Sequence, residues 1–211
     1  MLGHSQGCVL TVQMAASELG AELLGLEIAG TGCELQPRAA AILAARSPAR
    51  VPARVRARVL GGPRRGTGIE MRDLVWGPGH LYPPGAARTV GLTSSTPPYE
   101  VDDVRGWADD LPALAPRVRV PVHYSLGQHE RVWRSGPPAL AEIAALFTAS
   151  PRVAADEQAG AGHMLSRGLS AVAYHLKVLS FAEECALARG ISAAGRRESP
   201  GAAAVTQLAG G

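Results

Sequence analysis

The chain has 211 residues, of which 46 % are hydrophobic and only 4 % aromatic, and its formal net charge is +3. This length suits one domain with room for an inserted subdomain, and the apolar content excludes a wholly disordered protein. The small charge gives no reason to expect a nucleic-acid partner. No apolar run reaches the roughly 20 residues that a membrane span requires.

The start of the chain bears on its cellular location, and the cysteines bear on metal and cofactor binding. No basic, apolar leader is visible, so we expect a cytoplasmic protein without a signal peptide. The three cysteines (Cys8, Cys33 and Cys185) are far apart and lack the spacing of metal ligands. They are typical of buried free thiols, and we expect neither a metal nor a cofactor.

A tight turn followed by a helix opens the chain. Residues 3–7 (Gly-His-Ser-Gln-Gly) lead directly into residues 8–19, whose apolar side chains recur at helical spacing, and Gly20 is a plausible stop. Residues 23–29 are mostly apolar and run into two glycines. This pattern favours a short, buried, parallel strand.

The pattern then breaks down from about residue 35 to residue 115, where prolines interrupt the sequence repeatedly. We interpret this region as an inserted lid of short helices and loops. Eight arginines and no acid lie between residues 38 and 65. They could receive a phosphorylated or acidic substrate such as an acyl-coenzyme A, but a solvated face of the lid is the simpler interpretation.

Strand and helix signals return in alternation after the insertion. The sequence predicts a strand over 118–126, a helix opened by two prolines from residue 137, a strand at 152–156, and a helix over about 170–188. This alternation predicts an α/β fold with a partial, mostly parallel sheet and helices on both faces. One domain would span residues 1–189, and residues 190–211 would form a disordered tail.

The opening turn matches the pattern G-x-S-x-G, in which a strand turns sharply into a helix and presents a strained serine. We expect both flanking glycines, Gly3 and Gly7, to be needed because a side chain there would collide with neighbouring backbone. The N–H groups at the start of the following helix would favour negative charge beside Ser5. Ser5 is therefore the candidate nucleophile.

A serine nucleophile needs a base, and the base needs a group that orients it. The candidate base is His163, in an Ala-Gly-His-Met loop after the last predicted strand. The candidate acid is Glu130, just past the strand that ends before Gly127. Glu34, past the earlier strand, is a rival for that role and Asp156 a weaker one. We favour Glu130.

Serine, glutamate and histidine in this order, each at a strand end, resemble the α/β-hydrolase family. The resemblance covers about residues 1–34 and 116–189 and begins at the nucleophile elbow, with glutamate in place of the commoner aspartate. It implies a catalytic triad of Ser5, Glu130 and His163, with the backbone N–H of Gln6 as one donor of the oxyanion hole. The strands and the second oxyanion donor that the family places before the elbow have no counterpart.

The resemblance predicts a serine hydrolase that cleaves a small ester or thioester through an acyl-enzyme on Ser5. Acyl transfer to another acceptor, or perhydrolysis with peroxide, could use the same site. The missing front part predicts an N-terminally truncated protein. The Ala, Gly and Pro content, with Lys177 as the single lysine among many arginines, indicates a bacterial source. It also leaves open a non-catalytic remnant of a hydrolase.

Overall fold

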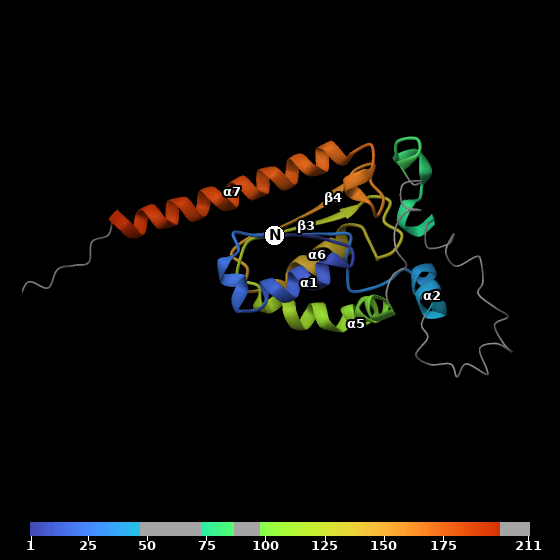
Figure 1. Ribbon diagram of the computed structural model, residues 1–211, viewed down its shortest axis with the longest axis horizontal. Coiled ribbons are helices and arrows are strands. Elements are labelled where there is room, and N and C mark those ends of the chain that lie inside the picture. The colour runs from blue at the N-terminus through green and yellow to red at the C-terminus, as the bar shows by residue number, and fades with distance from the viewer. Residues whose placement is uncertain (47–72, 87–97, 199–211) are drawn as a thin grey trace, which may run out of the picture.

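The computed structural model describes residues 1–46, 73–86 and 98–198 (Figure 1). Strands and helices alternate through most of this region, as the sequence predicts. In chain order the elements are β1 (Leu2–His4), α1 (Gly7–Ala15), η1 (Glu18–Glu22), β2 (Leu26–Ala29), α2 (Pro37–Arg46), η2 (Gly79–Leu81), α5 (Pro98–Leu114), η4 (Ala115–Arg117), β3 (Val122–Gly127), α6 (Pro137–Leu146), β4 (Val153–Gln158), η5 (Leu165–Arg167) and α7 (Ala171–Glu198).

The four strands form one parallel sheet in the order β1-β2-β3-β4. Gly3 lies opposite Ile28, and Ile28 lies opposite Tyr124. Every residue of β2 and β3 is buried, as expected of strands covered on both faces. Because all four strands run the same way, their carboxyl ends meet at one edge, where open α/β sheets bind ligands. This confirms the predicted fold class.

One face of the sheet packs in the main hydrophobic core. Leu26 and Ile28 of β2 and Tyr124 of β3 are fully buried there, together with side chains of α1, α5 and α6. Figure 1 shows these three helices on the same side of the strands. The main chain of β2 is thereby fixed, and with it the turn that follows.

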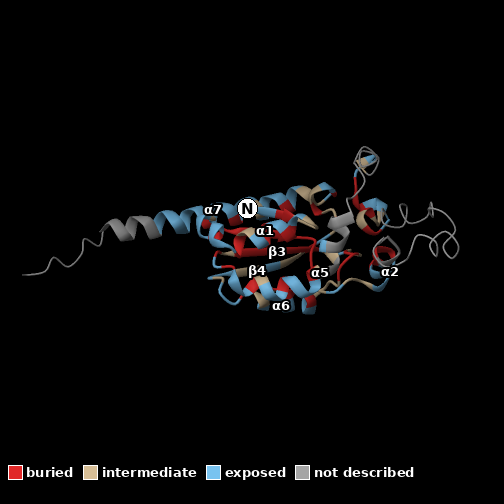
Figure 2. Cartoon of the chain, turned by 60° about the horizontal axis from the view of Figure 1, so that its bottom comes forward, coloured by how far each residue is buried: buried red, intermediate tan, exposed pale blue. Residues whose placement is uncertain are grey.

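The opposite face of the sheet is covered by α7 (Figure 1), and Leu165 of η5 joins the small cluster there with Ala29 and Tyr174. Tyr174, Phe181 and Cys185 of α7 are buried, while much of its length is exposed in Figure 2. Although we expected the helix to end near residue 188, it extends to Glu198. The predicted disordered tail therefore begins too early, and residues 199–211 lie outside the described part.

The predicted insertion, about residues 35–115, is in part a component of the core. Trp107 and Leu111 of α5 are buried in the main cluster, and the indole N–H of Trp107 donates to Thr31 Oγ1 at 2.7 Å. Residues 47–72 and 87–97, with most of the arginine-rich stretch, lie outside the described residues, so the lid and its arginines stay predictions. None of the described helices is long and apolar enough to cross a membrane.

Candidate active site

The turn after β1 has the geometry expected of a nucleophile elbow. Ser5 has φ of +52°, a left-handed conformation that is strained for a residue other than glycine. Its backbone N–H donates to Ala29 O at the end of β2 at 2.8 Å, and helix α1 begins two residues later. The packed strand on one side and the helix on the other hold the serine in this conformation.

The two glycines that flank the elbow differ in what they contribute. A Cβ at Gly3 would lie 2.3 Å from Thr11 Oγ1 and 2.9 Å from Gly7 O, so no side chain fits there without a backbone shift. A Cβ at Gly7 would meet nothing within 4 Å among the described residues. The sequence expectation of a collision is thus confirmed at Gly3 and wrong at Gly7.

His163 lies on the loop that follows β4 and reaches Ser5. Its Nε2 is 2.8 Å from Ser5 Oγ, and the residue is only 2 % exposed. The loop packs closely: a Cβ at Gly162 would lie 2.6 Å from Tyr82 Oη, so only glycine lets Tyr82 approach. The backbone of the acid loop also holds it, because His129 N–H donates to Ala161 O at 2.8 Å.

Glu130 contacts the other ring nitrogen of the histidine. Its Oε2 and Oε1 lie 2.9 and 3.0 Å from His163 Nδ1, and Glu130 is 4 % exposed. Oε1 also accepts the backbone N–H groups of Arg131 and Val132 at 2.9 and 2.7 Å. Burial alone would raise the pKa of Glu130, but the charge and hydrogen bond of His163 and the backbone N–H groups of Val132 and Trp133 outweigh it and lower that pKa.

The ionised glutamate thus has a partner for its charge. A carboxylate at Nδ1 fixes the imidazole with its proton on that nitrogen and leaves Nε2 free to accept the serine proton. The arrangement brings Ser5, His163 and Glu130 into one hydrogen-bonded chain.

The two rival acids are engaged elsewhere. Glu34 is 65 % exposed at its side chain and pairs with Arg134 Nε at 2.6 Å. Asp156 accepts from Ser125 Oγ at 3.1 Å and pairs with Lys177. Neither contacts His163 in the structure.

The loop that contains Glu34 instead supports the acid loop. Gln36 Nε2 donates to Glu130 O at 2.8 Å and to Trp133 O at 3.0 Å, and Leu35 forms a bridge with Trp133. Residues just past β2 therefore hold the residues just past β3 by hydrogen bonds. This contact restrains the backbone of Glu130.

Gln6 is the N-cap of α1 and directly follows the serine. Its backbone N–H belongs to the positive end of the helix, where a developing oxyanion would be stabilised. The role of Gln6 as one oxyanion donor stays a prediction. Within the described residues, no group of three or more His, Cys, Asp or Glu side chains is arranged to hold a metal ion.

Three polar contacts, one at the site and two beneath α7, were not predicted from the sequence. His4 Nε2 lies 2.7 Å from His163 O, which joins the elbow to the histidine loop. Under α7, Glu27 contacts His123 and accepts from Tyr174 Oη at 3.1 Å, and all three side chains are buried. Their residue types alone gave no signal, because each contact joins elements that are distant in sequence.

Comparison with known proteins identifies similar solved structures but no similar sequence. No protein-family model and no curated protein matches the sequence. Among solved structures, the chain is similar to the monoacylglycerol lipase of Paleococcus ferrophilus, with a TM-score of 0.60 and 15 % identity over 87 % of this chain and 67 % of that one. It is likewise similar to the monoglyceride lipase of Saccharomyces cerevisiae, with a TM-score of 0.60 and 15 % identity over 88 % and 61 %.

An esterase from Rhodococcus sp. is similar too, with a TM-score of 0.53 and 18 % identity over 86 % of this chain and 64 % of the esterase. The chain therefore has the α/β-hydrolase fold, as its three motifs imply. It spans about two thirds of the length of these structures, and at such low identity the likeness concerns the fold alone.

Proposed function

We propose that the chain is a serine hydrolase that cleaves carboxylic esters or thioesters through an acyl-enzyme on Ser5. The observation that supports this best is the hydrogen-bonded series from Ser5 Oγ to His163 Nε2, at 2.8 Å, and from His163 Nδ1 to Glu130 Oε2, at 2.9 Å. In this order Ser5 is the nucleophile, His163 is the base that takes its proton, and Glu130 orients the base.

Acylation begins with proton transfer from Ser5 Oγ to His163 Nε2 as the oxygen attacks the substrate carbonyl. The tetrahedral oxyanion accepts a hydrogen bond from the N–H of Gln6. The negative charge of Glu130, held by backbone donors, stabilises the imidazolium that forms. The imidazolium then gives its proton to the departing alcohol or thiol, which leaves the acyl group on Ser5.

Deacylation repeats these roles with water. His163 takes a proton from a water molecule as it attacks the acyl-enzyme carbonyl, and returns the proton to Ser5 Oγ as the acid departs. An alcohol, a thiol or hydrogen peroxide in place of water would make the same site an acyltransferase or a perhydrolase. The triad geometry is common to all three outcomes, so hydrolysis is the reaction to test first.

Two of the similar structures are named as monoacylglycerol or monoglyceride lipases and another as an esterase. Short p-nitrophenyl esters and monoacylglycerols are therefore the substrates to try first. The proposed mechanism uses neither a metal nor a cofactor for these substrates.

A fluorophosphonate probe tests the proposal directly, because it is attacked only by an activated serine and loses fluoride as the Oγ–P bond forms. We expect one label per chain, at Ser5. Ser5→Ala and His163→Ala should each abolish both labelling and p-nitrophenyl ester hydrolysis, since triad members act as a unit. His175→Ala, at an exposed position of α7, serves as the matched control and should keep both.

An unlabelled wild-type chain with a cooperative thermal transition would contradict the proposal. It would favour the alternative of a non-catalytic hydrolase remnant.

A further inference from the structure

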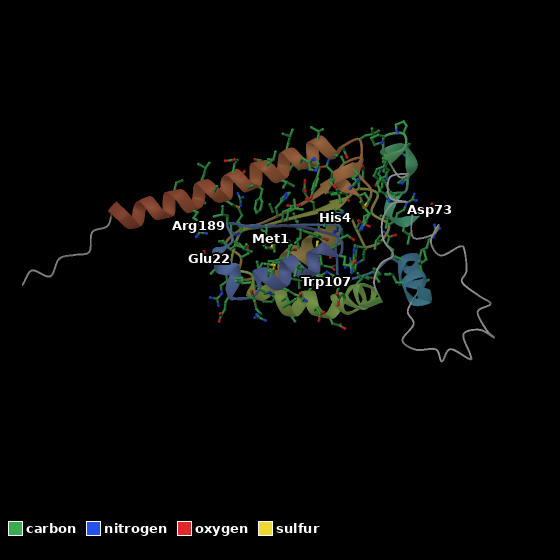
Figure 3. All side chains as sticks on the ribbon, in the orientation of Figure 1. Met1, His4, Glu22, Asp73, Trp107 and Arg189 are labelled. Atoms are coloured by element: carbon green, nitrogen blue, oxygen red, sulfur yellow. The ribbon has the colours of Figure 1, made fainter. Side chains whose placement is uncertain are left out.

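His4 joins the two loops on which the proposed chemistry depends. It is the last residue of β1 and directly precedes Ser5, and its Nε2 lies 2.7 Å from the carbonyl oxygen of His163. Figure 3 labels His4 toward the same end of the molecule as Asp73, away from Met1. Residues 2–6 and the loop 160–165 both lie in the described part of the chain. Between them, this is the only hydrogen bond besides the one that joins Ser5 and His163.

The chemistry of the acceptor fixes the state of the His4 ring. A carbonyl oxygen can only accept, so Nε2 of His4 must bear the hydrogen and donate it. In the neutral ring Nδ1 is then bare. Burial lowers the pKa of His4 to about 4, and nearby His163 lowers it too, so that the ring is neutral near pH 7.

A neutral ring matters because of what lies beside it. The His4 and His163 rings are 5.2 Å apart between centroids. A charged His4 would oppose the positive charge that His163 acquires in each turnover. A neutral His4 can hold the histidine loop without that repulsion.

The backbone of β2 leaves room for this contact. Gly30 follows β2 with φ of +63°, and a Cβ on it would lie 3.0 Å from His4 Nε2 and 3.3 Å from His163 Cε1. Both imidazole rings therefore converge on a position where a side chain would press on them. Gly30 is needed for its conformation and for its missing side chain alike.

We propose that His4 is a positioning residue: it donates a hydrogen bond to the His163 carbonyl and so keeps His163 Nε2 within reach of Ser5. Glu130 orients the ring from one side, and His4 restrains the backbone that bears it. His163, not His4, is placed to act as the base, because Ser5 Oγ lies 2.8 Å from His163 Nε2. This inference rests on the proposed function of the triad.

The test compares His4→Phe, which fills similar space without a donor, with His4→Gln, whose Nε2 can reach the same carbonyl. In the full 211-residue chain, His4→Phe should lower kcat on a p-nitrophenyl ester roughly tenfold, about the contribution of one hydrogen bond, with KM changed less than about twofold. His4→Gln should recover most of the loss. His175→Phe, at an exposed site on α7, should change neither constant.

The pH profile separates positioning from a general structural role. A loosened His163 contacts Glu130 less well, so its imidazolium is less stabilised. The acid limb of kcat/KM should therefore move to lower pH in His4→Phe and return in His4→Gln. Equal losses in both variants with an unchanged pH profile would overturn the inference, as would full activity in His4→Phe.

A second readout does not depend on turnover. In the chain labelled with ¹⁵N-histidine, NMR should show His4 as the neutral Nε2–H tautomer near pH 7, and a protected Nδ1–H signal for His163. His4→Phe should lose that protection while His4→Gln keeps it. If the wild-type chain proves inactive, the proposed function fails but this comparison still decides the role of His4. Equal protection in all three proteins would refute it.

Discussion

Replacing Glu130 by glutamine should disable the base without removing it. Oε1 of the carboxylate accepts backbone N–H groups from Arg131 and Val132 at 2.9 and 2.7 Å. In the variant the amide oxygen must stay with these donors, since an NH₂ group there would face other N–H groups. The NH₂ then points at His163 Nδ1 and can only donate to it.

The consequence is the wrong tautomer of the histidine. Nδ1 must be bare to accept from the amide, so Nε2 carries the hydrogen and cannot take the proton of Ser5. In a Ser-His-Asp triad the equivalent change lowers kcat by roughly 10⁴-fold. Because both oxygens of Glu130 lie within 3.0 Å of Nδ1, some rotation can relieve the clash, and we expect a loss of about 10³ to 10⁴.

That loss equals about 4 to 5.5 kcal/mol of activation free energy. Initial rates on a p-nitrophenyl ester measure it, with thermal melting to verify that the variant folds. Glu34→Gln is the matched control, because Glu34 is exposed and pairs with Arg134, and it should cost less than twofold or so. The reasoning fails if Glu130→Gln keeps more than about a tenth of wild-type kcat, or if Glu34→Gln loses as much.

Three further outcomes are expected. Gly3→Ala should destabilise the chain by about 1–3 kcal/mol in urea unfolding and Gly7→Ala far less, since a Cβ meets backbone only at the first; equal effects would contradict this. Tyr174→Phe should cost about 1–2 kcal/mol by leaving Glu27 short of a donor, and an unchanged midpoint would argue against that bond. The lowered pKa of Glu130 means that its stabilisation is present above its unfolded pKa and lost as pH falls through the folded one, so Glu130→Gln should flatten the acid limb of stability against pH.

The tight turn at Ser5 could be predicted because its signal is local. A glycine at residue 3, a serine two positions later and an apolar helix behind them specify a turn within one short segment. Parallel strands then bring their carboxyl ends to one edge, so residues just past each strand converge. Glu130 and His163 followed from that rule. The choice between Glu130 and Glu34 did not, because both lie just past neighbouring strands.

Prolines and glycines led to wrong predictions of loops and helix ends, because their effect depends on where in a helix they lie. Pro98 is the first residue of α5, where its missing N–H costs nothing, and Pro112 falls in the last turn. The prolines up to Pro98 had indicated short helices and loops. We expected Gly190 to be the start of the tail, but it lies within α7. One glycine costs a helix only about 1 kcal/mol, which is too little to end it. A tertiary contact such as that of Trp107 with Thr31 is not visible in local sequence.

The structure holds two buried glutamate–histidine pairs, Glu27–His123 within the sheet and Glu130–His163 on the loops at its edge, and their surroundings explain why only one suits catalysis. His123 contacts Glu27 through Nδ1, and its Nε2 lies 3.6 Å from Asp156 Oδ1. Burial lowers the pKa of His123, but the hydrogen bond and charge of Glu27 and the charge of Asp156 outweigh it and raise that pKa.

With carboxylates facing both of its nitrogens, His123 has no nitrogen directed at a hydroxyl that it could deprotonate. His163 has a carboxylate at Nδ1 only, and its Nε2 faces the hydroxyl of Ser5. A base must be free to gain a proton from the group that it activates. The same two residue types therefore form a buried structural pair beneath α7 and the proposed general base with its orienting acid at the edge of the sheet, and the group at the second ring nitrogen makes the difference.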